Sequence, residues 1–388
     1  MKNGKRQNTA NHHQNMGFKL FIGLLLTPFS LLYGCVAAVR RFLYRKRILP
    51  SEKSPIPAID IGNLAVGGTG KTPHTQYVLG LLKDSFHVAA LSRGYGRSSK
   101  GYRSVKQCDN ADINAQIFGD EPFMTHLRFP DIPLAVDGNR AEGVRNLLNE
   151  NPEIEVIVLD DAYQHLRFQP TFHVLLTEYD RPYRPDMPMP SGLLREFPRA
   201  ARFADAVVVT KVPDGADADE SAWRHRLHIK PHQQLFFTRF RYEQLSPVTE
   251  AAQKIDPQSV RDIVVLTGIA HPEPLLDHLR KDAKFCVSTT KGKLNVVKHY
   301  AFPDHHSFTE KEIQSIYNQY FDNIGEDCVL VTTEKDWMRL QSEQIINIVS
   351  LLPVFVVRVE VEFLTENQRD TFNQILKDHV RRKKKEDS

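Results

Sequence analysis

The feature that most constrains the fold is the stretch from Ile59 to Leu82, which reads IDIGNLAVGGTGKTPHTQYVLGLL. An apolar strand, a glycine-rich turn and a helix follow one another there without interruption. Residues 65–72 read A-V-G-G-T-G-K-T, which is the phosphate-binding loop with Ala65 where the strict pattern has glycine. An alanine is compatible with the entrance of the turn, so the stretch predicts a nucleotide site between a strand and a helix.

The chemistry of this loop depends on its glycines and on Lys71 and Thr72. Glycines allow backbone N–H groups to approach an anion closely, and the helix N-terminus adds positive charge. Lys71 is placed to reach the β- and γ-phosphates, and the Thr72 hydroxyl is placed to bind Mg²⁺. The residues predicted to bind ATP are Ala65, Val66, Gly67, Gly68, Thr69, Gly70, Lys71 and Thr72.

A phosphate-binding loop needs a partner acid at the end of a buried strand. The stretch EVIVLDD supplies Asp160 and Asp161 after four apolar residues. We expect Asp160 to hold Mg²⁺ together with Thr72, and the neighbouring carboxylate to orient a reacting group. Both aspartates are candidate catalytic residues, as is Lys71.

Short apolar runs alternate with helical segments along the chain, which predicts a parallel sheet covered by helices on both faces. We therefore expect an α/β fold of the P-loop NTPase type with a smaller second α/β domain. The predicted strands are 57–63, 87–93, 132–136, 155–160, 173–179 and 205–211, with a second set at 262–270, 327–333 and 352–361. The predicted parts are an N-terminal arm and anchor (1–50), a domain that carries the phosphate-binding loop (51–232), a connector resembling a β-ribbon (233–261) and the smaller domain with its basic tail (262–388).

Composition limits the class of protein. A chain of 388 residues suffices for two domains, and 41% hydrophobic with 25% charged residues is ordinary for a globular protein. The net charge of +4 suits an anionic ligand or an acidic membrane surface and does not argue for nucleic acid. Four widely spaced cysteines without a C-x-x-C pair favour a reducing compartment.

The N-terminal region contains the longest apolar run. Residues 20–39 carry no charge, and Lys19 precedes them while a cluster of arginines and lysines at 40–47 follows. Three interpretations of this run are open. It could be a retained membrane anchor that lies on or crosses the bilayer, a cleaved signal peptide with Val36-Ala37-Ala38 at its cleavage site, or a buried core helix. Pro28 weakens a straight helix. The basic cluster and the need for ATP favour an anchor that keeps the rest of the chain in the cytoplasm.

The phosphate-binding loop alone does not name a reaction. Partition-type ATPases share G-G-x-G-K-T, but Val66 occupies the position of their signature lysine. GTPases use N-K-x-D to read guanine, whereas residues 210–213 read T-K-V-P. A membrane-associated partition-type ATPase that acts on protein partners nevertheless remains as the alternative to a small-molecule kinase.

Seven motifs occur in order and together carry a resemblance. They are GNLAVGGTGKTP, LSRGYGR, GDEP, VIVLDDAYQH, PSGLLRE, FPDHHSF and TEKD. In this order they resemble the tetraacyldisaccharide 4'-kinase family of lipid A biosynthesis over most of the chain. The departures, such as Ala162-Tyr163 where the family commonly has Gly-Phe, remove no ionisable group. The resemblance implies transfer of the ATP γ-phosphoryl group to the 4'-hydroxyl of a tetraacylated disaccharide 1-phosphate.

The resemblance also implies an anionic glycolipid substrate and a location at the cytoplasmic face of the inner membrane, with ATP and Mg²⁺ as cofactors. Arginines on loops after strands are suited to phosphate recognition. The predicted substrate-binding residues are Arg93, Arg97, His165 and Arg195.

The remaining role is that of the base. A sugar hydroxyl is a weak nucleophile at neutral pH, and a carboxylate paired with histidine is a stronger base than a carboxylate alone. The resemblance places an acting aspartate in GDEP and an acting histidine in DHH. We therefore expect Asp120 to accept the hydroxyl proton with support from His305, and we expect the two residues to come from different domains.

Overall fold

The computed structural model describes residues 4–109, 113–256, 260–281, 294–304, 306–321 and 328–387, so His305 lies outside the described residues. The chain divides into two compact units, and each contains more than one segment of sequence. The first unit comprises Met1–Ser92, Asn139–Arg239 and Phe363–Ser388, and the second comprises Arg93–Gly138 and Phe240–Glu362.

The first unit contains a sheet of parallel strands in the order β10-β9-β8-β2-β6-β3. Nearly all residues of its central strands are buried, which explains why these strands read as continuous apolar runs. The prediction of a parallel sheet is therefore confirmed. The strands are β2 Ala58–Asn63, β3 Val88–Ser92, β6 Val156–Asp160, β8 Phe172–Glu178, β9 Ala206–Thr210 and β10 Gln234–Tyr242, the last of which belongs to this unit as far as Arg239.

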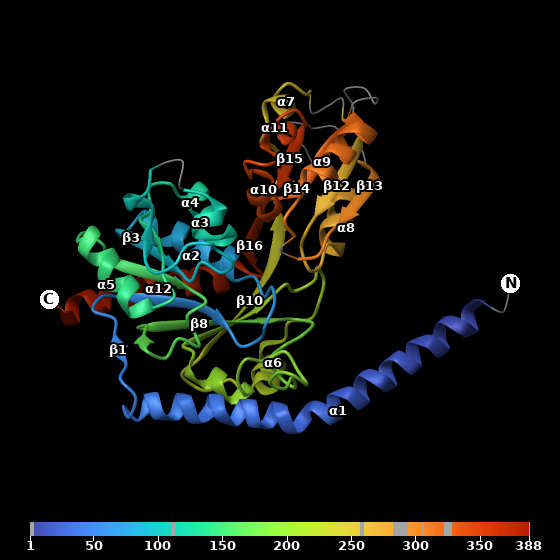
Figure 1. Ribbon diagram of the computed structural model, residues 1–388. Helices are drawn as coiled ribbons and strands as arrows, with labels where there is room; N and C mark the ends of the chain where they lie inside the picture. Colours follow the sequence, from blue (N-terminus) through green and yellow to red (C-terminus); the bar gives the residue numbers. More distant parts are fainter. Residues whose placement is uncertain are drawn as a thin grey trace. The chain divides into compact units, whose positions relative to one another are not determined.

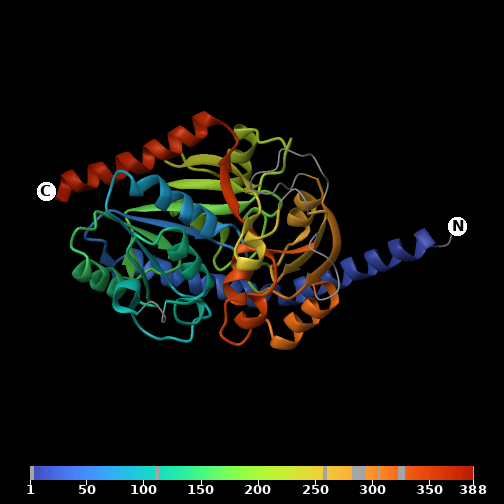
Figure 2. The same cartoon turned by 90° about the horizontal axis from the view of Figure 1, so that it is seen from above.

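Helices pack on this sheet, and the last helix of the chain is one of them. They are α2 Lys71–Lys83, α5 Arg140–Glu150, α6 Glu220–Leu227 and α12 Glu366–Asp387, with a 3₁₀ segment at Pro198–Phe203 and a short parallel pair β1 Glu52–Lys53 and β7 Phe168–Gln169. Figure 2 shows α12 in red beside the strands of this unit. Its Phe372 ring lies 5.2 Å from the ring of Phe236 and 6.2 Å from that of Tyr77, so α12 completes the core of the first unit.

The N-terminal segment forms one helix, α1 Gly4–Arg45, drawn in dark blue in Figure 1. Pro28 lies inside it, although proline lacks the N–H that the helix would use at that position. Within the described residues, no helix combines the length and the apolarity needed to cross a bilayer. Ser30, Arg41 and Tyr44 are buried, so one face of the C-terminal half of α1 packs on the first unit.

The second unit has its own sheet in the order β11-β15-β14-β12-β13, parallel except for β11. Its strands are β11 Ser246–Pro247, β12 Asp262–Thr267, β13 Asn295–Ala301, β14 Cys328–Thr333 and β15 Val354–Val357. Its helices are α7 Glu250–Gln253, α8 Glu273–Lys281, α9 Glu310–Ile316, α10 Glu334–Leu340 and α11 Ile346–Val349, and a π-helical turn at Tyr317–Phe321 follows α9. Strand β16 Val359–Phe363 leads back to the first unit.

The segment 93–138 adds two helices and a short antiparallel strand pair to the second unit. Helices α3 Ala115–Phe118 and α4 Asp120–Arg128 are joined at Gly119, and β4 Arg103–Ser104 pairs antiparallel with β5 Leu134–Val136. A 3₁₀ turn at Val105–Gln107 follows β4.

Three features differ from the sequence-based expectation. Residues 363–388 were expected in the smaller domain, whereas they belong to the first unit. The region 233–261 was expected to form a connector, whereas β10 pairs in parallel with β9 as a strand of the first sheet, because its residues 235–238 are all buried. The segment that carries Asp120 was expected in the domain that carries the phosphate-binding loop, whereas it belongs to the second unit. Long-range packing of α4 against α10 decides this placement, and such packing has no local sequence pattern.

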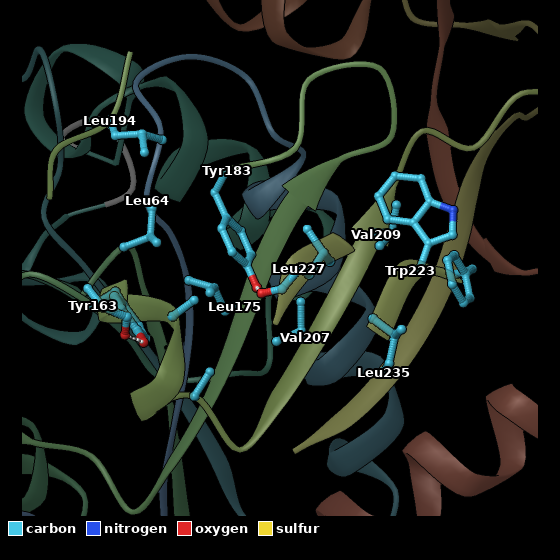
Figure 3. Close-up of a cluster of buried hydrophobic side chains, with 14 of the residues drawn as sticks. Leu64, Tyr163, Leu175, Tyr183, Leu194, Val207, Val209, Trp223, Leu227 and Leu235 are labelled. Carbon is cyan, nitrogen blue, oxygen red and sulfur yellow. Dashed lines mark hydrogen bonds between the residues drawn. The ribbon is translucent and has the colours of Figure 1, made fainter. Parts of the chain in front are cut away.

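Each sheet has its own apolar core. In the first unit, side chains from several strands and from α6 surround Tyr183 and Trp223, as Figure 3 shows. The second unit has one cluster on each face of its sheet, around Val265 on one face and Leu266 on the other. The cluster in Figure 3 includes Leu64, which lies at the start of the glycine-rich loop. The core of the first unit therefore anchors that end of the loop.

Candidate functional site

The glycine-rich loop lies between β2 and α2, as predicted. Gly67 has φ 107° and Gly70 has φ 90°, which are left-handed values that strain any residue with a side chain. A Cβ atom at Gly67 or Gly68 would meet no described atom within 4 Å, so this stretch of backbone faces open space. The loop therefore has the exposed backbone and the helix N-terminus that bind an anion.

Polar side chains hold the loop from behind. The Asn63 amide donates to the Thr69 hydroxyl at 2.7 Å, and the Thr210 hydroxyl donates to the Thr69 carbonyl at 3.0 Å. All three residues are nearly fully buried, with at most 3% of their surface exposed. These bonds fix the middle of the loop from strands β2 and β9.

His74 holds the end of the loop where α2 begins. Its Nδ1 lies 2.8 Å from the Gly70 carbonyl, and its Nε2 lies 3.0 Å from the Thr238 hydroxyl. Burial lowers the pKa of His74 to about 4, so the ring is neutral near pH 7. In the neutral ring Nδ1–H donates to the carbonyl and Nε2 accepts from the hydroxyl.

Lys71 and Arg195 meet at Asp161. The Lys71 Nζ lies 3.8 Å from the Asp161 carboxylate, and the Arg195 Nη1 donates to both carboxylate oxygens at 2.9 Å. Asp161 also has φ 53°, which is costly for a residue other than glycine. Such backbone strain persists where surrounding contacts enforce it, and it concentrates at functional sites.

Asp160 ends β6 and is buried, with 8% of its surface exposed. The Ser92 hydroxyl lies 3.4 Å from its carboxylate, and the buried Arg140 donates to its carbonyl at 3.1 Å. In the parallel pairing of β2 with β6, Asp160 lies opposite Ile61, two residues before β2 ends. The carboxylate therefore lies at the same edge of the sheet as the loop.

The segment PSGLLRE lines the loop entrance, which the sequence did not indicate. The Val66 N–H donates to the Leu193 carbonyl at 2.8 Å, and the Arg195 N–H donates to the Leu64 carbonyl at 2.7 Å. Leu64 and Leu194 both belong to the cluster in Figure 3. These two backbone hydrogen bonds hold Arg195 beside the loop, where its guanidinium contacts Asp161.

The other predicted substrate-binding residues lie in different places. His165 is half-buried on the loop after β6, in the first unit with Arg195. Arg93 and Arg97 belong to the second unit, and the Arg97 guanidinium donates to the Gly101 carbonyl at 2.6 Å and to the Ser99 hydroxyl at 3.2 Å. In this structure the Arg97 guanidinium therefore binds groups of the loop that carries it.

Asp120, the predicted base, begins α4 in the second unit. Gly119 precedes it with φ 92°, and a Cβ atom at that position would come within 2.9 Å of the Tyr95 carbonyl oxygen. The Arg339 Nε and Nη2 each lie 2.7 Å from the same oxygen of the Asp120 carboxylate. His305, the predicted partner, is outside the described residues, so its role stays a prediction.

Sequence reasoning missed Asp60, a fully buried acid within β2. Its carboxylate accepts the Ala162 N–H at 2.9 Å and lies 3.0 Å from Nδ1 of His173. It thereby supports the turn that follows Asp160 and Asp161. The only signal in the sequence was an acid between two isoleucines.

Sequence reasoning also missed the ion pair of Arg41 with Glu196. The Arg41 Nε and Nη2 lie 2.6 and 2.7 Å from the two oxygens of Glu196, and Nη2 also donates to the Tyr163 carbonyl at 3.0 Å. Burial opposes the charge of Arg41, but the bonds and charge of Glu196 outweigh it and raise the pKa of Arg41. This pair joins α1 to the residue beside Arg195.

Comparisons with known proteins place the chain in a family. A family model described as tetraacyldisaccharide-1-P 4'-kinase matches residues 22–381. The tetraacyldisaccharide 4'-kinase of Bacteroides thetaiotaomicron is 40% identical over 369 residues, which cover 92% of this chain and 93% of that protein. That of Flavobacterium johnsoniae is 38% identical and covers 85% of this chain and 91% of that protein.

A solved structure agrees with this placement. LpxK from Aquifex aeolicus, crystallised in complex with ATP, superposes with a TM-score of 0.67 at 25% identity, covering 92% of this chain and 99% of that chain. The P-loop geometry, the ordered motifs and these matches agree, and the chain therefore belongs to the tetraacyldisaccharide-1-P 4'-kinase family.

Proposed function

We propose that this chain is a kinase that transfers the γ-phosphoryl group of ATP to the 4'-hydroxyl of a tetraacylated disaccharide 1-phosphate, as the names of its relatives describe. The observation that carries the proposal is the loop at residues 65–72 with Lys71, Asp161 and Arg195 gathered beside it. Phosphoryl transfer needs positioning and charge stabilisation more than covalent chemistry, and these residues supply both.

Lys71 and Arg195 are the cations placed to stabilise negative charge on the transferred group. Both contact Asp161, whose carboxylate occupies the place between them. A bound γ-phosphate offers these cations a second anion, and Lys71 would then bridge Asp161 and the phosphate. Arg195 would remain fixed by Asp161 and Gln164, because its Nη1 also donates to Gln164 at 3.1 Å.

The residues at this edge of the sheet fit a magnesium ion. Mg²⁺ is usually held by one or two side-chain oxygens together with waters and substrate phosphates. The Thr72 hydroxyl and the Asp160 carboxylate provide such oxygens, and the described residues hold no cluster of three or more His, Cys, Asp or Glu that would form a full metal cage. When bound, the ion supplies charge neutralisation at the β- and γ-phosphates.

Asp120 is the residue to which we assign the acceptance of the hydroxyl proton, with His305 raising its basicity or relaying the proton. Support comes from its geometry: the carboxylate is 21% exposed and is held by Arg339 at the start of α4. Lys71 and Asp160 serve the nucleotide, so the acceptor hydroxyl requires a different base.

We also propose that the protein binds the cytoplasmic face of the inner membrane through α1. Apolar side chains recur every three or four residues on its outward face, each more than half exposed. They are Leu25 (65%), Phe29 (63%), Leu32 (65%), Val36 (61%), Val39 (56%) and Phe42 (55%). This spacing forms one stripe on a helix whose opposite face is packed on the first unit, which is the arrangement of a helix lying in a membrane interface.

Basic residues surround the end of this stripe. A pocket of about 490 Å³ between α1 and the 3₁₀ segment is lined by Arg41, Phe42, Arg45, Lys46, Glu196, Arg199 and Arg202, among others. The guanidinium carbons of Arg45 and Arg202 lie 4.2 and 4.7 Å from the centre of the Phe203 ring. Such a gathering of cations beside an apolar stripe is suited to anionic lipid headgroups.

Vesicle flotation tests the membrane proposal. Leu32→Asp should lower the bound fraction on vesicles that contain phosphatidylglycerol by about tenfold, because it puts a charge where an exposed apolar side chain would enter the membrane. Leu351→Asp is the matched control, since Leu351 is 61% exposed and lies outside α1. Equal binding of both variants would show that another surface makes the contact.

The activity proposal is tested by measuring ADP with and without the lipid acceptor. We expect little ADP from Mg-ATP alone, and rapid ADP formation with a bis-phosphorylated lipid product when a disaccharide 1-phosphate is present. A partition-type ATPase would instead release ADP without any lipid product, and that outcome would overturn the assignment.

A further inference from the structure

The motif TEKD has no role in the chemistry described so far. It begins at Thr333, at the end of β14, and continues into α10. Lys335 and Arg339 are four residues apart on this helix and therefore share one face. Both side chains contact the first turn of α4, where the predicted base Asp120 lies.

Arg339 joins two carboxylates within the second unit. Its Nε and Nη2 contact one oxygen of Asp120 at 2.7 Å, and its Nη1 donates to Asp336 at 3.1 Å and to the Gly268 carbonyl at 3.2 Å. The Arg339 side chain is 7% exposed, so the guanidinium is held on both sides. A planar guanidinium fixed in this way restricts the orientation of each carboxylate that it contacts.

Asp336 anchors the arrangement from the interior. It is fully buried, and its second oxygen accepts the Gly268 N–H at 3.0 Å and the Thr333 hydroxyl at 2.7 Å. Burial raises the pKa of Asp336, and the bonds from Gly268 and Thr333 and the charge of Arg339 oppose that shift. Since a Cβ atom at Gly268 would stand 3.0 Å from this carboxylate, the anchor is also tightly packed.

Lys335 makes the second connection. Its Nζ lies 3.9 Å from Glu121, the residue after Asp120, and 3.4 Å from Asp304, the residue before His305 in the sequence. The Lys335 side chain is 22% exposed. It thus links the helix that carries one candidate catalytic residue to the segment that precedes the other.

We propose that α10 positions the base for phosphoryl transfer, with Arg339 orienting the Asp120 carboxylate and Lys335 tying Asp304 to the first turn of α4. This inference rests on the proposed role of Asp120 and His305. Arg339 and Lys335 are positioning residues, because they act through the acidic side chains that they contact. The cation beside Asp120 also favours the ionised carboxylate, which is the form that accepts a proton.

The test compares Arg339→Gln with Arg339→Lys in the full chain on Mg-ATP and the lipid acceptor. We expect Arg339→Gln to lower kcat by about 100-fold, since small displacements of a catalytic group cost about that much. The KM for ATP should stay within about twofold, and the acidic limb of the pH–rate profile should move to higher pH because the cation is lost. Arg339→Lys keeps the positive charge. Its kcat should therefore recover in part, and the acidic limb of its pH–rate profile should return to the wild-type position.

Arg358→Gln is the matched control, because Arg358 pairs with Glu334 on the same helix at 3.3 Å and is 43% exposed. It should leave kcat and the pH profile unchanged. Lys335→Gln keeps the inference testable if Arg339→Gln lowers the melting temperature severely, because Lys335 is more exposed. We expect Lys335→Gln to lower kcat about tenfold with an unchanged KM for ATP.

The results separate this inference from the proposed function. Wild-type kcat and pH dependence in both Arg339→Gln and Lys335→Gln, alongside a strongly impaired Asp120→Ala, would overturn the inference and leave the base assignment standing. An unimpaired Asp120→Ala would overturn the base assignment itself. A fall in kcat that Arg339→Lys does not relieve, with no change of the pH profile, would show a purely structural role for Arg339.

Discussion

Breaking the ion pair of Arg41 with Glu196 should destabilise the first unit strongly. Their side chains are only 10% and 6% exposed, and two short contacts join them. Arg41→Met keeps the apolar stem but leaves the Glu196 charge buried without its partner. Removing one member of a buried pair costs about 3–5 kcal/mol, so we expect a loss of at least about 3 kcal/mol in the free energy of unfolding.

The assay is urea unfolding followed by tryptophan fluorescence. The chain has two tryptophans, and a Trp337→Phe background leaves Trp223, buried in the core of the first unit, as the reporter. Glu196→Leu and the double variant with Arg41→Met complete a thermodynamic cycle. The double variant should be more stable than the sum of the two losses predicts, by about 2 kcal/mol, because it leaves no unpaired buried charge.

An exposed ion pair provides the control for this cycle. Arg224 and Glu220 pair on the surface of α6 with 35% and 53% exposure, so Arg224→Met should cost less than about 1 kcal/mol. A loss of less than 1 kcal/mol for Arg41→Met, or strict additivity in the double variant, would refute the reasoning. It would mean that water or another group replaces the lost partner.

Three further predictions concern the site. Lys71→Ala and Thr72→Ala should each remove most of the kinase activity, because γ-phosphate charge and Mg²⁺ placement carry the reaction, and near-normal turnover in either would contradict the nucleotide assignment. Asp120→Ala should depress kcat strongly with little change in ATP affinity, whereas a loss mainly of ATP or Mg²⁺ binding would make this carboxylate a metal ligand or a structural group. The folded-state pKa of His74 is lowered to about 4, so the unfolded chain binds its proton first as the pH falls. The contribution of neutral His74 to the free energy of unfolding is fully present above pH 6.5. It should fall by roughly 3 kcal/mol between pH 6.5 and 4. Urea midpoints across this range should decline less in His74→Gln, and an equal decline would show that other groups set the slope.

Local features were predictable from the sequence because their causes are local. The helix expected after the glycine-rich turn is found at Lys71–Lys83, and the acid expected after a buried strand is found at the end of β6. Apolar runs, glycine positions and the strand-to-helix spacing each report on a few neighbouring residues. For the same reason the positions of the glycine-rich turn and of the acids after β6 were predictable, whereas their roles stay predictions.

The remaining contacts had no local signature. Arg339 meets Asp120 across 219 residues of sequence, and Arg41 meets Glu196 across 155. No periodicity or spacing reports such pairs, since each depends on how distant elements pack. The division of the chain into units was misjudged for the same reason, because residues 93–138 and 363–388 each pack with a segment distant in sequence.

The central claim is that the phosphate-binding loop serves transfer to a lipid hydroxyl, and the position of the new phosphate tests it most directly. The chain would be incubated with Mg-ATP labelled at the γ-phosphate and a tetraacylated disaccharide 1-phosphate, and the product analysed by mass spectrometry and phosphorus NMR. We predict one labelled phosphate at the 4'-oxygen for each ADP formed, and almost none with Lys71→Ala. Label released as inorganic phosphate, or attached at another position, would contradict the account.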